Sequence, residues 1–227
     1  METEFLDRHV CMACCTREGE STAGFMQRFR AQFGKPTGFW GTVAGWIMAS
    51  RPSNRQRNKW AVSLLHLQPA DRVLEIGFGP GLAIHLMSTL VPDGHVVGLD
   101  HSDVMLQQAR KRNASAIARG RVTLWLGSVS DLPAFHVPFD KILAVNSTQF
   151  WENAVDVLRK LRQQMTPGGR IALAFQPRSA RATNDEAHAA GRNMVEWLRV
   201  AGFGQVRLEI KPLKPVPVVC AVGLNEI

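Results

Sequence analysis

Short apolar segments alternate with longer segments of mixed hydrophobic and polar residues along most of the chain. Each apolar segment has the length of a buried strand, and the mixed segments repeat their apolar residues at helical spacing. This alternation predicts βαβ units, in which a mostly parallel sheet carries helices on both faces. The predicted strands are Arg72–Ile76, His95–Leu99, Val122–Leu126, Phe139–Val145 and Arg170–Phe175, and the predicted helices run from Ser53 or Asn54 to about Leu67, Leu82–Leu90, Ser102–Ala118, Ala154–Met165 and Asn184–Val200.

The end of the chain departs from this alternation. Two apolar segments, Gln205–Ile210 and Val218–Gly223, are joined only by residues 211–217. So short a connection has no room for a crossover helix, and the two strands must therefore pair antiparallel. We expect an α/β fold with a seven-stranded, mostly parallel sheet, helices on both faces and a C-terminal antiparallel hairpin.

The segment before the first strand follows a different pattern. Residues 1–37 show no sustained hydrophobic period, and we interpret them as an N-terminal appendage. Residues 38–67 begin with a short apolar stretch that contains Trp40 and Trp46, and they continue as a predicted helix. The predicted organisation is therefore the appendage followed by one domain, residues 38–227.

The composition is that of a globular protein with a basic balance. Of the 227 residues, 45% are hydrophobic and 20% are charged, which fits one α/β domain with an appendage. The net charge of +8 favours an anionic partner, but the basic residues are scattered over predicted helices, where solvated faces explain most such groups. No apolar run approaches the roughly 20 residues of a membrane span, and the acidic N-terminus does not resemble a signal peptide. We expect a cytoplasmic protein without a membrane span.

Three of the four cysteines lie close together near the N-terminus. Cys11 and Cys14 have the C-x-x-C spacing of half a zinc site. No second Cys/His pair follows at the spacing of a zinc finger. His9 is the only histidine nearby, and Cys220 is remote in the sequence. A disulfide framework is not expected in a cytosolic chain of this size. We therefore expect no metal site.

The candidate chemistry is concentrated where the first predicted strand ends. Gly77, Gly79 and Gly81 alternate with Phe78 and Pro80 in a glycine loop, residues 77–81, and an apolar helix follows directly. A loop of this kind leaves backbone N–H groups free at the helix start, and glycine lets a ligand approach the backbone closely. Parallel sheets bind their ligands at this edge, outside the carboxyl ends of the strands.

The spacing distinguishes this loop from two other nucleotide-binding loops. Leu82 stands where the G-x-G-x-x-G fingerprint of dinucleotide-binding proteins has its third glycine, and the Gly-Lys-Ser/Thr sequence of a P-loop is missing. The second predicted strand runs into Asp100, about 20 residues beyond the loop, where a carboxylate can accept hydrogen bonds from a pair of ribose hydroxyls. Together, the loop and Asp100 predict a ribose-bearing ligand.

With these residues the sequence resembles the class I S-adenosylmethionine (SAM)-dependent methyltransferases, in particular the small-molecule branch that includes the ubiquinone- and menaquinone-type enzymes. The resemblance extends from about Asn54 to the C-terminus. It implies a Rossmann-like fold, SAM as cofactor and S-adenosylhomocysteine (SAH) as product. The matching segments are Val73–Gly81, Val97–Asp100 with Met105 shortly after, Gly127–Pro133 and Thr166–Gly169.

The resemblance also implies a set of cofactor contacts. Glu75 and the three glycines of the loop would hold the methionine end of SAM, and Asp100 would accept hydrogen bonds from both ribose hydroxyls. His101 and Met105 would flank the adenine, Met105 through apolar packing. An exposed position at the start of a helix is an equally good interpretation of His101.

One adenine contact departs from the family pattern. After the third strand the family has Gly-Asp-Ala-x-x-Leu-Pro, in which the acidic side chain reads the adenine amino group, but here Ser128 takes that place. A serine hydroxyl can still accept this hydrogen bond, and the N–H of Val129 can serve a ring nitrogen. Asn146, at the end of the fourth strand, completes the expected cofactor site near the transferred methyl group.

The acceptor is expected at the end of the fourth strand. Gln149 and Trp151 can hold an organic molecule there. In the family the segment before the first strand commonly folds over the cofactor as a lid, so Trp40 and Trp46 are candidates for the same role, although they could equally cover the sheet edge as part of the core. Residues 146–151 lack the Asn/Asp-Pro-Pro-aromatic motif typical of enzymes that methylate nucleic-acid bases.

The function that we expect is transfer of the SAM methyl group to a small organic acceptor by in-line displacement, and nucleic acid is not the expected partner. No residue is convincing as a general base. Two alternatives remain: a methyltransferase acting on RNA or protein, which would use the positive charge, and a SAM-binding protein without catalysis, for which Ser128 leaves room. A nicotinamide-dependent oxidoreductase is a weaker alternative. The oligomeric state stays open, with a homodimer among the options.

Overall fold

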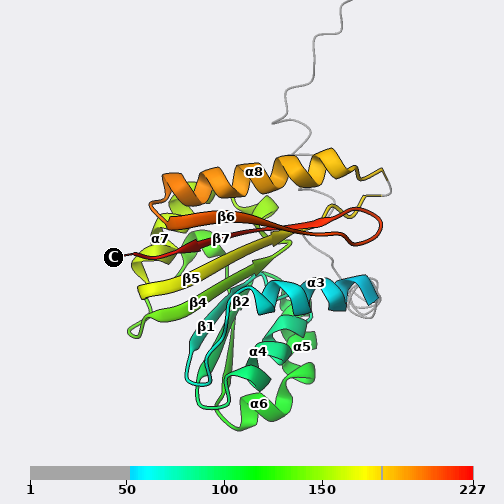
Figure 1. The fold of residues 1–227 in the computed structure, drawn as a ribbon. Coiled ribbons are helices and arrows are strands. Elements are labelled where there is room, and N and C mark those ends of the chain that lie inside the picture. The colour runs from blue at the N-terminus through cyan, green and yellow to red at the C-terminus, as the bar shows by residue number, and fades with distance from the viewer. Residues whose placement is uncertain (1–51, 180, 227) are drawn as a thin grey trace, which may run out of the picture. The chain divides into compact units, whose positions relative to one another are not determined.

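The computed structural model describes residues 52–179 and 181–226. This part of the chain is built on one seven-stranded sheet in the order β3-β2-β1-β4-β5-β7-β6 (Figure 1). Strands β1 to β5 run parallel, and β7 pairs antiparallel with both β5 and β6. The predicted fold class is confirmed. The strands are β1 (Arg72–Ile76), β2 (His95–Asp100), β3 (Val122–Leu126), β4 (Phe139–Val145), β5 (Met165–Phe175), β6 (Gly204–Lys211) and β7 (Val218–Leu224).

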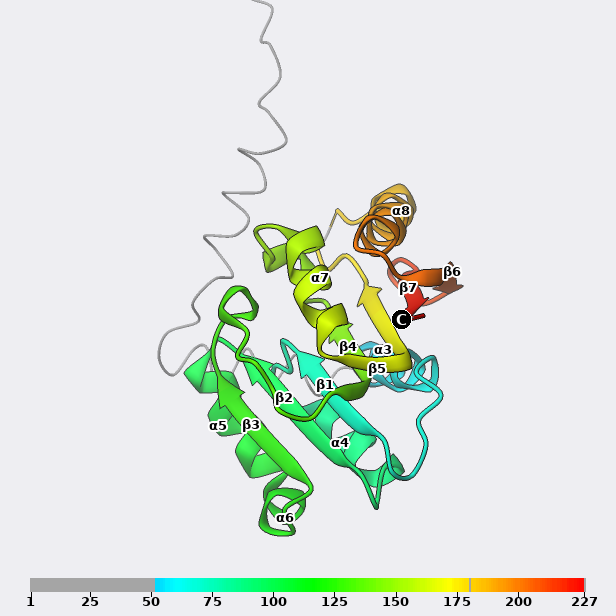
Figure 2. The ribbon, with the colours of Figure 1, turned by 90° about the vertical axis from the view of Figure 1, so that its left-hand side faces the viewer.

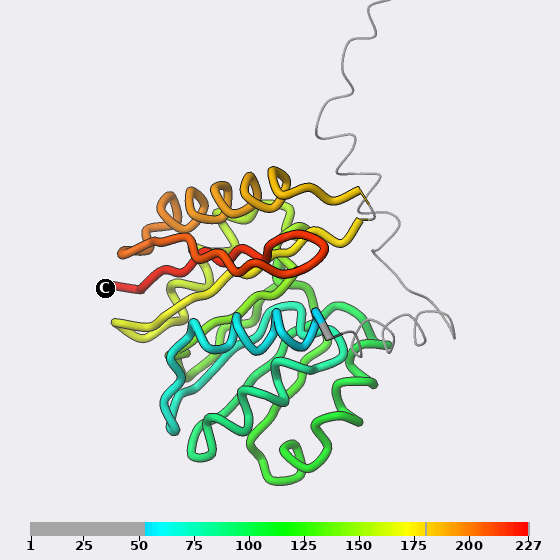
Figure 3. The backbone as a smooth tube through the Cα atoms, turned by 45° about the vertical axis from the view of Figure 1, so that its right-hand side comes forward, coloured from blue at the N-terminus to red at the C-terminus, as the bar shows by residue number. Residues whose placement is uncertain are grey.

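Helices cover both faces of the sheet (Figures 2 and 3). One face packs against α3 (Pro52–Ser63), α4 (Leu82–Leu90), α5 (Asp103–Arg112) and α6 (Ala114–Ala118). The other face packs against α7 (Ala154–Gln163) and α8 (Asn184–Val200). Two short 3₁₀ helices, η1 (Val129–Asp131) and η2 (Thr148–Phe150), follow β3 and β4. None of the helices in the described ranges is long and apolar enough to cross a membrane.

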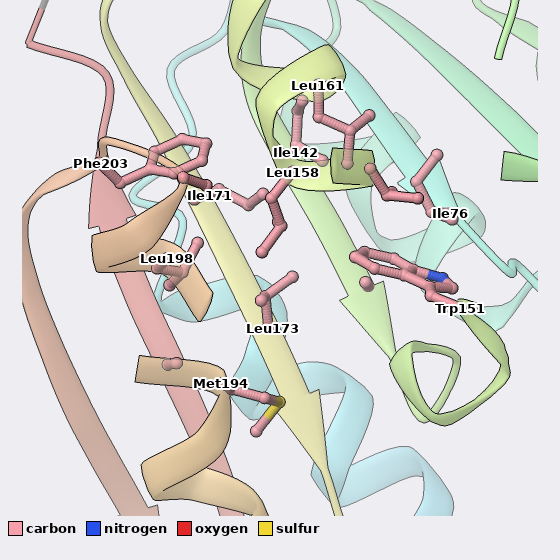
Figure 4. Close-up of a cluster of buried hydrophobic side chains, with 14 of the residues drawn as sticks. Ile76, Ile142, Trp151, Leu158, Leu161, Ile171, Leu173, Met194, Leu198 and Phe203 are labelled. Atoms are coloured by element: carbon pink, nitrogen blue, oxygen red, sulfur yellow. The ribbon is translucent and has the colours of Figure 1, made fainter. Parts of the chain in front are cut away.

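Each face of the sheet has its own hydrophobic core, because strands of a central parallel sheet point apolar side chains in both directions. The core beneath α7 and α8 includes Ile76, Leu158, Leu173 and Met194 (Figure 4). The core on the opposite face is formed by a second set of residues from the strands, from the helices α3 to α6 and from the adjoining loops, among them Leu65, Val73, Phe78, Ile84, Met87, Val96, Leu106 and Leu143.

The prediction of one continuous helix over Ser102–Ala118 is wrong. Asn113, with φ −105° and ψ 15°, separates α5 from α6. Its side-chain Nδ2 donates to the carbonyl of Ala109 at 2.9 Å and to that of Gly81 at 3.1 Å. An asparagine side chain that bonds backbone groups in this way competes with regular helix formation. The break therefore ties α5 to the glycine loop.

Two other predicted boundaries also differ. The predicted helix to Leu67 ends at Ser63, and His66 has the left-handed φ of 52°. Strand β5 begins at Met165 instead of Arg170, because Met165 pairs with Phe139 before an irregularity in the register. The predicted appendage, residues 1–37, and its boundary with the domain lie outside the described residues.

Candidate active site

The candidate site lies at the edge of the sheet where β2, β1 and β4 end side by side. Ile76 of β1 is in register with Leu99 of β2 and with Ala144 of β4. The backbone pairing continues into the loops, since the N–H of Gly77 donates to the carbonyl of Leu99 at 2.7 Å. The glycine loop, Asp100 and the segment after β4 are therefore neighbours, as a topological switch point in a parallel sheet requires.

The three glycines of the loop are required for different reasons. All three have positive φ, +73° at Gly77, +51° at Gly79 and +75° at Gly81, a conformation that side-chain-bearing residues rarely adopt. A Cβ at Gly77 would lie within 3.0 Å of the Ser147 side chain, and one at Gly81 would lie 2.8 Å from Ala109 Cβ. A Cβ at Gly79 would meet no atom of the described residues within 4 Å. The protein's own packing thus needs the first and third glycines, whereas Gly79 faces open space that a ligand can enter.

Asp100 lies directly beside this open space. Its Oδ2 accepts a hydrogen bond from the N–H of Gly79 at 2.8 Å, and its Oδ1 accepts one from the N–H of Ser102 at 2.9 Å. The side chain is buried, and burial raises the pKa of Asp100, while these two N–H groups partly oppose the rise. A carboxylate has about four lone-pair sites, so both oxygens can still accept from a pair of hydroxyls. His101 is exposed, with its Nδ1 3.9 Å from Asp100 Oδ1.

Glu75 is a buried carboxylate that lies two residues before the loop. It is 2% exposed, and its Oε2 has no hydrogen-bond partner in the described part of the chain. Burial raises the pKa of Glu75 well above its usual range, and the nearby Asp100 raises it further, whereas the N–H of Ile84 opposes the rise. An unpaired buried acceptor is costly unless a ligand supplies a donor. The open glycine, Asp100 and this carboxylate fit the ribose of SAM and the α-ammonium group of its methionine end.

The segment after β4 is fixed to both neighbouring strands. Asn146 has the left-handed φ of 52°, and its Nδ2 donates to the carbonyl of Gln176 at 2.7 Å, while its Oδ1 accepts from the N–H of Gln176 at 3.2 Å. Ser147 Oγ donates to the carbonyl of Ile76 at 2.8 Å. The ends of β1, β4 and β5 are thereby held together. The amide of Asn146 is engaged in this link, and its predicted contact with the cofactor stays a prediction.

The two predicted acceptor residues after β4 have different surroundings. Gln149 is half-buried, and its Nε2 donates to the carbonyl of Asn146 at 2.8 Å, but its buried Oε1 has no partner among the described residues. Trp151 is 6% exposed and packs in the core with Ile76 and Leu158 (Figure 4). Packing accounts for Trp151, while Gln149 keeps an acceptor atom for a ligand. Trp40 and Trp46 lie outside the described residues.

The residues predicted to contact adenine lie on the β2–β3 side of the site. The N–H of Gly127 donates to the carbonyl of Asp100 at 2.9 Å, which brings the loop after β3 to the end of β2. Ser128 caps the N-terminus of η1, and its Oγ accepts from the N–H of Ser130 at 3.2 Å. Val129 is half-buried, and Met105 is 8% exposed in the core beneath α5. Their contacts with adenine stay predictions.

Arg57 and Gln176 were not predicted from the sequence. Arg57 is 3% exposed, and its Nη1 donates to Gln176 Oε1 at 2.9 Å. Gln176 also donates from its Nε2 to the carbonyl of Val216 at 2.8 Å. Arg57 stands in a polar run together with the exposed Arg55 and Lys59, so no pattern in the sequence distinguishes the buried arginine from its neighbours.

Comparison with known proteins identifies the family. The sequence pattern of the methyltransferase domain matches residues 73–169. The uncharacterized methyltransferase YdaC of Bacillus subtilis (strain 168) is 32% identical over 181 residues, which are 80% of this chain and 97% of YdaC. A demethylmenaquinone methyltransferase of Symbiobacterium thermophilum is 31% identical over 120 residues, 51% of this chain and 48% of that protein.

Solved structures show the same fold. The N-methyltransferase NodS from Bradyrhizobium japonicum WM9, in complex with SAH, is 16% identical and has a TM-score of 0.62 over 80% of this chain and 92% of NodS. These matches agree with the glycine loop, Asp100 and the unpaired carboxylate of Glu75 at the switch point of the sheet. The chain therefore belongs to the class I SAM-dependent methyltransferases.

Proposed function

We propose that the acceptor of the methyl group is a small organic molecule that binds at the carboxyl ends of β4 and β5. The observation that carries this proposal is the division of the sheet edge into two halves. The glycine loop and Asp100 belong to β1 and β2, whereas Gln149 and Gln176 follow the next two strands along the sheet. A donor and an acceptor that occupy neighbouring halves of one edge can meet in line.

The size of the acceptor is limited by the short connections around this half of the edge. In the described residues, only the segment 146–153, which includes η2, separates β4 from α7, and no inserted domain stands there. The acceptor half is formed by side chains of the sheet edge itself. This arrangement suits a molecule of metabolite size.

The chemistry asks mainly for positioning. SAM supplies a methyl group that is already activated by its positively charged sulfur, so no covalent enzyme intermediate is needed. The glycine loop and Asp100 orient the donor. The segment after β4, which is hydrogen-bonded to the ends of β1 and β5, orients the acceptor. Holding two reactants in line in this way is worth about 7–11 kcal/mol of the barrier in favourable cases. A base is needed only where the acceptor must lose a proton, and no side chain is assigned to that role.

Quinone-type acceptors are the first class to test. The sequence resembles the ubiquinone and menaquinone branch, and one relative is named as a demethylmenaquinone methyltransferase. Calorimetry with SAH should first establish cofactor binding by the purified protein. A panel of hydroxylated quinols, small amines and thiols should then be screened for SAH formation. Stoichiometric SAH binding without turnover on any acceptor would favour the non-catalytic alternative.

RNA is a second candidate acceptor, and one observation favours it. A surface cavity of about 540 Å³ lies between α3, α4 and the end of α5, and its lining includes Arg55, Lys59, His85 and Arg112. Basic side chains around a groove bind phosphates with strong salt dependence. Binding of a tRNA mixture that weakens steeply between low and high salt, together with methyl transfer to that RNA, would replace the small-molecule proposal.

A further inference from the structure

Arg57 is a buried cation without a counter-ion in the described structure. It is 3% exposed, and its hydrogen-bond partners are the side-chain oxygens of Asn54 and Gln176, both neutral amides. Among residues 52–179 and 181–226, no aspartate or glutamate forms an ion pair with Arg57. Its Nε has no hydrogen-bond partner there either. Buried charges in proteins are normally paired, and the described residues provide no anion for this one.

The electrostatics of the surroundings point the same way. Burial lowers the pKa of Arg57 to about 9, and Arg178 lowers it as a second nearby cation. At neutral pH the guanidinium is still charged, and it lies beside another positive group. An anion placed here would be attracted by both cations and would relieve the cost of burying the first.

The position of Arg57 on α3, next to the end of β5, places it away from the residues expected to bind the cofactor. Gln176, which binds Arg57, follows the end of β5 and is linked through its backbone to Asn146 after β4. Strand β5 is two positions from β1 in the sheet, about 10 Å at the usual strand spacing. The glycine loop and Asp100 lie at the ends of β1 and β2. Arg57 therefore belongs to the acceptor half of the edge.

We propose that Arg57 binds an oxyanion, a carboxylate or a phosphate, carried by the methyl acceptor. This inference rests on the proposed function and narrows its substrate class. A guanidinium has five N–H donors in a planar fork that matches the two oxygens of such a group. Asn54 and Gln176 fix the plane of the fork, and the unpartnered Nε is free to donate. Within any class of acceptor, quinols included, a member without an anionic group would leave the cation unpaired and would bind more weakly.

The test compares Arg57→Gln with a matched control, Arg55→Gln. Both variants lose one positive charge from α3, but Arg55 is exposed and Arg57 is buried. Thermal unfolding of the full-length protein saturated with SAH is measured with acetate, inorganic phosphate or chloride in the millimolar range, at constant ionic strength.

We expect acetate or phosphate to raise the Tm of the wild type and of Arg55→Gln above the chloride value. In Arg57→Gln this increase should be lost, and the Tm in chloride should equal or exceed that of the wild type, because a buried unpaired cation has been removed. The anion that raises the Tm more, acetate or phosphate, indicates whether the acceptor carries a carboxylate or a phosphate.

Calorimetry with SAH completes the test. The affinity for SAH should stay within about twofold of the wild type in both variants, a difference well under 1 kcal/mol. A tenfold loss in Arg57→Gln would overturn the proposal, because Arg57 would then bind the carboxylate of the cofactor. Equal effects of the anions on Arg57→Gln and the wild type, or no effect on the wild type, would also overturn it. If no variant, including the wild type, bound SAH, the proposed function itself would fail, which the calorimetry reports separately from the response to anions.

Discussion

Gly77→Ala and Gly79→Ala should impair different properties of the protein, stability in the first and ligand binding in the second, although the two glycines are only two residues apart. At Gly77 a Cβ would lie within 3.0 Å of the Ser147 side chain, which donates its own hydrogen bond to β1. At Gly79 a Cβ would extend into space where no atom of residues 52–179 or 181–226 lies within 4 Å. Gly77→Ala is therefore expected to damage the fold, and Gly79→Ala to damage ligand binding.

The magnitudes follow from the backbone and from the contact. Both substitutions place a side chain at a left-handed φ, which costs about 1–2 kcal/mol. Only Gly77→Ala adds an overpacked contact, for which roughly 1–3 kcal/mol is typical. The free energy of unfolding should thus fall by about 2–5 kcal/mol in Gly77→Ala, but by about 1–2 kcal/mol in Gly79→Ala. For a domain of this size each kcal/mol corresponds to a decrease in Tm of about 2–4 °C.

Thermal unfolding and calorimetry with SAH measure the two defects separately. Gly79→Ala should lose at least about tenfold in SAH affinity, 1.4 kcal/mol or more, with a decrease in Tm of only a few degrees. Gly77→Ala should show the larger decrease in Tm, and Ser147→Gly introduced into it should recover the part due to the contact, which a double-mutant cycle isolates. Wild-type SAH affinity in Gly79→Ala would refute the reasoning, as would equal stability of the two alanine variants.

Three further outcomes are expected. Asp100→Asn places an amide N–H₂ against one of the two backbone N–H groups that the carboxylate binds, so SAH affinity measured by calorimetry should fall by about tenfold or more, whereas the exposed Asp103→Asn should bind SAH normally. Glu75→Gln tests the raised pKa of this carboxyl: the folded state binds its proton more tightly than the unfolded chain does, so stability falls as pH rises from the ordinary glutamate pKa toward the raised one. The variant should therefore be no more stable than the wild type near pH 4, with an advantage that grows toward neutral pH; thermal melts across this range that differ by a constant amount would contradict it. Trp151→Phe should lower the free energy of unfolding by about 1–3 kcal/mol through a cavity in the core; an unchanged Tm with an altered response to acceptors would contradict this and would support a contact of Trp151 with the acceptor.

The order and type of the strands could be predicted well from the sequence, because they depend on local features: the hydrophobic residues of each segment and the lengths of the connections. Mostly apolar segments of strand length identified β1 to β5, including the largely exposed β3, and the length of the connector alone predicted that β6 and β7 pair antiparallel. Helix ends were less predictable. The break at Asn113 depends on a side-chain bond to Gly81, 32 residues away in the chain, and no local pattern encodes such a contact.

The site divides in the same way. The glycine loop and Asp100 could be found because their spacing reflects backbone geometry common to a whole family. Arg57 could not be found, since its burial depends on Gln176, 119 residues further along the chain. Trp151 was predicted to touch the acceptor on the strength of its residue type; it packs in the hydrophobic core, and its contact with the acceptor stays a prediction. Polar residues whose role comes from distant partners need the three-dimensional structure to be recognised.

The hydrogen bond from the Gly79 N–H to Asp100 affects how much conformational entropy is lost when the cofactor binds and how fast the cofactor can exchange. The Asp100 carboxylate, which is expected to bind the ribose hydroxyls, already fixes the conformation of the glycine loop by accepting a 2.8 Å hydrogen bond from the Gly79 N–H. Little chain entropy then has to be lost when the ligand arrives, because that loss has already occurred during folding. A loop that is already shaped for its ligand needs less reorganisation on binding and release, which favours rapid exchange of the spent cofactor for a fresh one.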